Sequence, residues 1–66
     1  MNTKEEILFR LRELLAAEGS ALQMYTELMA SLKNEQMKAF FRDIANEEKQ
    51  HADIVRSLIS LIEGLA

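Results

Sequence analysis

The chain has 66 residues, no cysteine and a formal net charge of −3. A chain this short buries a small fraction of its surface, and because disulfides are excluded we expect a bound metal, a partner chain or both to stabilise it. The charges are spread evenly and no apolar run reaches the roughly 20 residues that span a bilayer, so we expect a soluble, cytoplasmic protein with neither nucleic acid nor membrane as a partner.

The first element is a long amphipathic helix, expected over residues 4–32. Thr3 and Glu6 have the spacing of a capping box, in which each residue satisfies a backbone N–H of the other. Glu18 occupies one position of the apolar series, and Gly19 beside it weakens the helix by about 1 kcal/mol relative to alanine, which suggests a close neighbour there. The apolar series advances in steps of four and three, through Leu11, Leu15, Leu22, Tyr25, Met29 and Leu32.

The second element is a helix expected over residues 35–63. Asn34 is a suitable N-cap, and Gly64 stands where a left-handed C-terminal glycine is common. Glu48 and His51 interrupt its apolar series, one helical turn apart. The apolar members of this series are Met37, Phe41, Ile44, Val55, Leu58, Ile62 and Leu65.

A short link between two long helices predicts an all-α fold, an antiparallel two-helix hairpin with one domain over residues 1–66. With a turn near residue 33, positions that face each other sum to about 66, so Glu18 should lie opposite Glu48, and His51 one turn away on the same face. Such a face is buried most simply by self-association about a twofold axis. The resulting four-helix bundle would hold four carboxylates and two imidazoles, which matches the di-iron carboxylate pattern.

Two segments carry a resemblance to a known family. Residues 18–25, EGSALQMY, resemble the Glu-x-x-Ala-x-x-x-Tyr pattern on the first metal helix of rubrerythrin-like ferritins, and residues 44–51, IANEEKQH, resemble their Glu-x-x-His helix. One hairpin in place of two is similar to the encapsulated ferritins. The resemblance implies that Glu18, Glu48 and His51 are the iron ligands and catalytic residues of a ferroxidase formed at a subunit interface.

The donor types indicate the same chemistry. Carboxylate and imidazole ligands suit iron, with manganese or zinc as substitutes. We expect two ferrous ions, shared between two chains, to be oxidised by dioxygen or peroxide, with Glu18 and Glu48 binding or bridging them and His51 completing the ligand set. Tyr25, seven residues after Glu18, is expected to hydrogen-bond a ligating carboxylate. Glu47 is turned by about 100° from Glu48 and is expected to face solvent and miss the site.

The expected assembly is a homodimer at least, and a ring of dimers stays open. An encapsulin shell is a further partner that the resemblance admits, which would place the protein inside a nanocompartment; iron storage would require such an enclosure, because a small bundle has no cavity for mineral. Two alternatives remain. One is a structural or adaptor homodimer whose polar seam residues set the helix register, and the other is a metal-stabilised bundle without redox activity.

Overall fold

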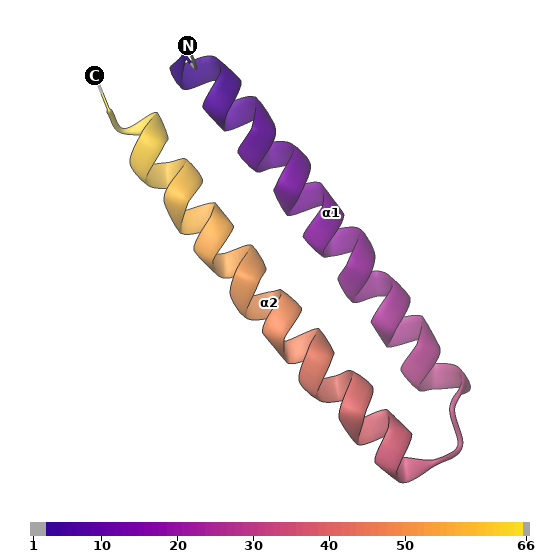
Figure 1. Cartoon of the computed structure of the whole chain (residues 1–66). Coiled ribbons are helices and arrows are strands. Elements are labelled where there is room, and N and C mark those ends of the chain that lie inside the picture. Colours follow the sequence, from indigo (N-terminus) through magenta and orange to yellow (C-terminus); the bar gives the residue numbers. More distant parts are fainter. Residues whose placement is uncertain (1–2, 66) are drawn as a thin grey trace.

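The computed structural model describes residues 3–65, which form two long α-helices, α1 (Lys4–Ser31) and α2 (Glu35–Glu63). The helices run antiparallel and side by side, and the start of α1 lies beside the end of α2 (Figure 1). The hairpin is a rod with Cα dimensions of 51 × 15 × 14 Å. The predicted all-α hairpin is therefore confirmed.

Side chains cap the N-terminus of each helix. The backbone N–H of Glu6 donates to Thr3 Oγ1 at 3.1 Å, and the Thr3 hydroxyl donates to Glu6 Oε1 at 3.2 Å. The Glu6 carboxylate thus contacts the hydroxyl, whereas a capping box would place it on the Thr3 backbone amide. At α2, the backbone N–H of Met37 donates to Asn34 Oδ1 at 3.0 Å, as expected of an asparagine N-cap.

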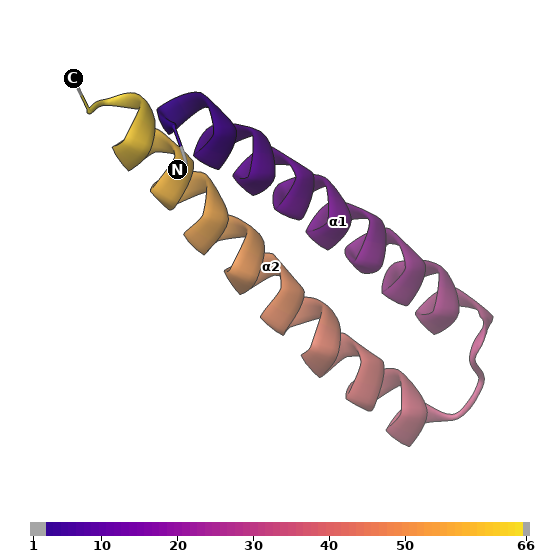
Figure 2. The ribbon, with the colours of Figure 1, turned by 45° about the horizontal axis from the view of Figure 1, so that its top comes forward.

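The helix ends differ slightly from the sequence expectation. Helix α1 ends at Ser31 because Leu32 has extended dihedral angles, with φ −86° and ψ 144°. A short link then leads to α2 (Figure 2). The prediction of a left-handed Gly64 is wrong, since its φ of −78° and ψ of −8° are right-handed. Its N–H donates to Ser60 O at 3.1 Å, a bond of the helical type, so the chain does not reverse there.

Lys4 joins the two helices at their free ends. Its ammonium group donates to the carbonyl oxygens of Glu63, at 3.2 Å, and of Leu65. Glu63 is the last residue of α2 and Leu65 lies two residues beyond it, at the end of the helix where the dipole favours a positive charge. Lys4 therefore covers the end of α2 at the position where a left-handed glycine was expected to do so.

The contact between the helices is narrow. On α2 the three residues Ala45, Ala52 and Ile59, each seven positions from the next, are buried against α1 together with Val55. Residues seven apart share one side of a helix, so this row defines the side of α2 that faces α1. The apolar series read from the sequence did not include these three residues.

Much of the predicted apolar series of α2 lies outside this contact. Met37, Leu58 and Leu65 are 48%, 42% and 62% exposed, and His51 shares their row. Helix α1 has a corresponding row. On each helix, this row is reached from the side that contacts the other helix by turning about the helix axis in the same direction. Because the two helices are antiparallel, both rows lie on one side of the hairpin. We call this side the open face; its rows are Ile7, Leu14, Ala21 and Leu28 on α1, and Met37, Ile44, His51 and Leu58 on α2, continued by Leu65 beyond the end of that helix, with Ala21 and Ile44 half-buried and the others exposed.

Neither described helix has a stretch apolar and long enough to cross a lipid bilayer.

Candidate metal centre

Glu18 of α1 and Glu48 and His51 of α2 come together in the hairpin. One ligand atom from each residue lies within 4.8 Å of the others. Within residues 3–65 this is the one group of three or more such side chains that could hold a metal ion. Glu18 is the fifteenth of the 28 residues of α1, and Glu48 is the fourteenth of the 29 of α2, so the cluster lies at mid-length.

The three side chains differ in their exposure to solvent. The Glu48 side chain is 20% exposed, and the His51 side chain is 55% exposed. Glu18 is half-buried, and its Oε2 atom is buried without a hydrogen-bond partner among the described residues. A buried carboxylate oxygen is costly unless a hydrogen bond or a cation compensates it. The cluster therefore lacks a positive charge that would compensate this oxygen.

His51 does not supply this compensating charge within the hairpin. Its Nδ1 atom lies 4.0 Å from Glu48 Oε1, which is beyond the range of a hydrogen bond. Lysine and arginine do not supply it either, because the ion pairs that they form among the described residues lie at the surface and join other acids. These pairs are Arg10–Glu13, Arg12–Glu63, Lys38–Glu35 and Arg56–Asp53.

Small residues let the helices approach each other on either side of Glu48. Ala45 and Ala52 lie one helical turn before and after it, and both are buried against α1. This apolar contact closes one side of the cluster. His51 lies on the other side, in the row of the open face. The cluster is therefore covered on the side of the alanines and open to solvent on the side of His51.

Tyr25 lies on the same helix as Glu18, on the side of the cluster toward the link. Its ring packs against Phe41, with centroids 6.2 Å apart, and Phe41 in turn meets Phe40 edge-on at 5.7 Å. Among the described residues the Tyr25 hydroxyl forms no hydrogen bond with the cluster. Its expected bond to a ligating carboxylate therefore stays a prediction, and the contact observed is aromatic packing.

Gly19 has no close neighbour in the hairpin. A Cβ atom added to it would meet nothing within 4 Å. The expectation that Gly19 permits a close contact is therefore wrong for the single chain.

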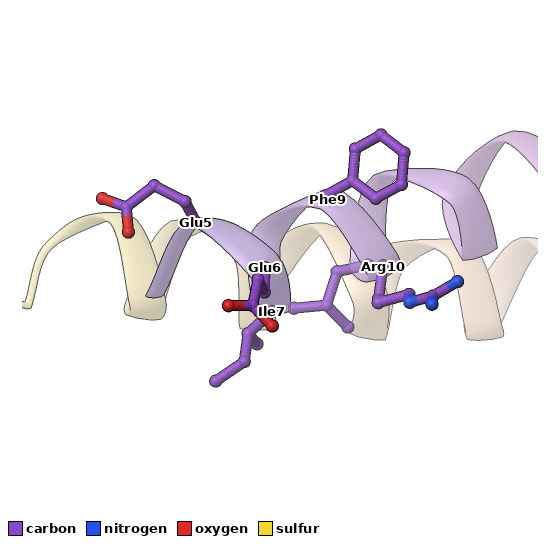
Figure 3. A pocket seen from close by; sticks show the side chains of 6 residues that line it. Glu5, Glu6, Ile7, Phe9 and Arg10 are labelled. Atoms are coloured by element: carbon purple, nitrogen blue, oxygen red, sulfur yellow. The ribbon is translucent and has the colours of Figure 1, made fainter. Parts of the chain in front are cut away.

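A surface hollow elsewhere on the molecule is not part of the cluster. It lies at the N-terminal end of α1, and the side chains that line it come from that helix alone (Figure 3). Its two acids, Glu5 and Glu6, belong to the first turn of α1, and neither joins the metal-binding group. The hollow is an open stretch of helix surface without converging donor atoms.

The chain matches a family of known proteins. The family model described as Rubrerythrin matches residues 10–64, a span that contains Glu18, Glu48 and His51. No curated protein and no solved structure gave a match. Rubrerythrin domains are ferritin-like helical domains that typically bind iron, and the matched span covers most of the chain. The chain belongs to the rubrerythrin family.

Proposed function

We propose that this protein oxidises Fe(II) at a di-iron centre held between two copies of the chain. The observation that carries the proposal is the Oε2 atom of Glu18, which is buried without a partner beside Glu48 and His51. An unsatisfied buried acceptor costs about 1–3 kcal/mol, and more when it is charged. A bound cation would offset this cost.

The donor set supports iron. Two carboxylates and one imidazole are hard and borderline ligands, which suit iron, manganese or zinc. Glu18, Glu48 and His51 thus fit the metal that is typical of the family. Their anionic charge also stabilises Fe(III) more than Fe(II), because the attraction grows with the charge of the ion.

The exposed residues of the hairpin support a second copy. His51 is more than half exposed, although it belongs to a cluster whose other members are mostly covered. It shares its row with exposed apolar residues that a soluble monomer would keep from water. A core of this size rarely stabilises a chain by itself. A second hairpin packed on the open face would bury these residues and cover the cluster on the side of His51.

The position of the cluster at mid-length suits a twofold assembly. A twofold axis through the middle of the open face would place two clusters opposite each other, whether it runs along the helices or across them. The two copies together would supply four carboxylates and two imidazoles. This is the ligand set of the di-iron carboxylate bundles, in which two helices give a Glu and two give a Glu-x-x-His.

Iron would supply the redox chemistry, and the chain would hold and balance it. Each Fe(II) gives one electron, so two ions reduce hydrogen peroxide and two protons to two waters, or dioxygen and two protons to hydrogen peroxide. Glu18 and Glu48 would neutralise the charge of the ions, while His51 would fix their position from the open side. The buried alanines beside Glu48 would exclude water from the back of the site.

The test is aerobic Fe(II) oxidation followed by absorbance. We expect the wild-type protein to accelerate oxidation over buffer, and Glu48→Gln, which keeps the side-chain shape, to lower the rate by about 100-fold through loss of a metal ligand. Glu27→Gln, at an exposed position of α1, is the matched control and should oxidise iron like wild type. Iron that binds without being oxidised would indicate a metal-stabilised bundle without redox activity. A dimer that binds no metal would indicate a structural adaptor, and either result contradicts the proposal.

A further inference from the structure

One row of side chains from each helix lies in the contact between α1 and α2. Near the free ends of the hairpin both rows carry large residues, since Leu8 and Ile59 belong to one buried cluster. Toward the metal-binding cluster the row of α2 changes to alanine, and Ala45 and Ala52 are 3% and 6% exposed. The row of α1 keeps leucine in this part. The two rows thus combine large with large residues at the free ends, and large with small residues at the cluster.

Two contacts fix the register of the helices. Glu18 meets Glu48 in the metal-binding cluster. Tyr25, seven residues after Glu18, packs against Phe41, seven residues before Glu48. A step forward along α1 therefore corresponds to an equal step back along α2, as in any antiparallel pair. Positions on either side of the two glutamates can be matched between the helices by counting.

Each buried alanine lies across from a leucine of α1. Ala52 is four residues after the glutamate of α2, and Leu15 is three residues before the glutamate of α1, so the two lie at nearly the same level. Ala45 and Leu22 match in the same way on the side of the link, at intervals of three and four residues. Both leucines are half-buried. The pair of glutamates is thus held between two pairs that each combine a leucine with an alanine.

The size of these side chains sets the distance between the helices. The axes of packed helices lie about 8–10 Å apart, depending on the side chains at the contact. A leucine that faces an alanine permits the short end of this range, whereas two facing leucines require the long end. The carboxylates of Glu18 and Glu48 come from opposite helices, so widening of the hairpin at this level would separate them.

A shared metal ion tolerates little widening. Ligand oxygen atoms lie about 2.1 Å from an ion such as zinc, so two oxygen atoms on one ion are at most about 4.2 Å apart. Ligand atoms of Glu18, Glu48 and His51 lie within 4.8 Å of one another in the hairpin. Widening by about 1–2 Å, the spread of helix separations, would force the glutamates into other rotamers or leave one of them off the ion.

The packing at this level already confines one ligand. Glu18 Oε2 is buried without a hydrogen-bond partner among the described residues. A carboxylate free to move would turn this oxygen to water, because leaving it unpaired is costly. The close approach of the helices therefore holds the oxygen where a cation would compensate it.

We propose that Ala45 and Ala52 are positioning residues of the metal centre: they set the separation of the helices at which Glu18 and Glu48 reach the same ion. The alanines act through the two glutamates and do not contact the ion. This inference rests on the metal binding in the proposed function, and it needs neither the second copy nor the oxidation of iron.

The test exchanges the volumes of one pair across the contact. Ala52→Leu should widen the hairpin at Leu15. We expect it to weaken the binding of Co(II), followed by absorbance, by about 10–100-fold, as does the loss of groups that orient metal ligands. The double variant Ala52→Leu/Leu15→Ala keeps the total volume, which cores tolerate best, and should restore the affinity to within about threefold of wild type.

Ala39→Leu is the matched control for the enlargement. Ala39 is exposed, and it shares a row of α2 with Asn46 and Asp53, away from the contact with α1. This variant should bind Co(II) like wild type. Far-UV circular dichroism of the metal-free proteins measures whether each variant is folded. If Ala52→Leu does not fold, the smaller enlargement Ala52→Val takes its place, alone and in the double variant.

Three results would overturn the inference. A folded Ala52→Leu variant with wild-type affinity would show that helix separation does not limit binding. A double variant that binds as weakly as the single one would show that volume is not the cause, and equal weakening by Ala39→Leu would show that the effect is not local. Wild-type protein that binds Co(II) without oxidising Fe(II) would refute the proposed function alone, and wild-type protein that binds no Co(II) would refute both.

Discussion

The two sides of α2 use their apolar residues differently. On the side toward α1, Ala45, Ala52 and Ile59 are buried within one chain. On the open face, Leu58 and Leu65 are larger on average, yet both stay exposed. A single hairpin therefore buries only the apolar residues on one of these two sides. The small residues allow close contact inside the chain, and the large ones remain to be covered by something else.

The metal-binding cluster lies on the border between these two sides. Glu48 is mostly covered by the contact with α1, whereas His51 belongs to the open face. A site built across such a border is half-formed in the single chain. Its completion and the burial of the open face are then one event, so metal binding and association should depend on each other.

A charge placed on the open face should have the largest effect on the assembly. Leu58→Lys should prevent dimer formation, because each dimer would lose two buried leucines, about 2 kcal/mol each, and gain two unpaired charges. We expect a rise of about 1,000-fold in the concentration at which the dimer forms, because about 4 kcal/mol corresponds to nearly three powers of ten, and sedimentation equilibrium measures it. Ser57→Lys adds the same charge one residue away, outside the row, and should leave the dimer intact. Equal behaviour of the two variants would show that Leu58 is not at an interface.

The next prediction concerns the stability of the dimer when His51, at the border between the two sides, is replaced by leucine. His51→Leu replaces a polar side chain in an apolar row, so without metal we expect the variant dimer to be more stable than wild type by about 1–2 kcal/mol. With saturating metal the order should reverse, because binding at 100 times the Kd stabilises wild type by about 2.7 kcal/mol. Denaturant unfolding with and without chelator measures both values. A variant that is more stable under both conditions would favour the adaptor.

The smallest expected effect lies on the side of α1 away from the open face. Gly19→Ala should raise the free energy of unfolding by about 0.5–1 kcal/mol, since alanine is the better helix former and its Cβ would meet nothing within 4 Å. Thermal unfolding measures this change. Destabilisation instead would mean that another copy packs closely against Gly19 in the assembly.

Much of the fold could be predicted from the sequence because it depends on local signals. Thr3 and Asn34 cap the two helices as their positions indicated. The short link set the antiparallel register, and from that register alone Glu18 was expected opposite Glu48, where the structure has it.

The sequence did not reveal which part of the apolar series faces α1. A wide apolar stripe has the same spacing whether one half or the other meets the neighbouring helix, so Met37 was grouped with the core although it is 48% exposed. The buried row of Ala45, Ala52 and Ile59 was detectable from its spacing of seven, yet two alanines give a weak apolar signal. The right-handed conformation of Gly64 was not expected, and neither was the contact of Lys4, from the other helix, with the carbonyl oxygen of Glu63.

We propose that two copies of the chain share metal ions at Glu18, Glu48 and His51. Native mass spectrometry of the protein after loading with Fe(II) measures chain number and bound ions together. We predict a species of two chains with two iron ions, and a dimer of Glu48→Gln without iron or with fewer ions. A metal-loaded single chain, or a wild-type dimer that carries no metal after loading, would contradict it.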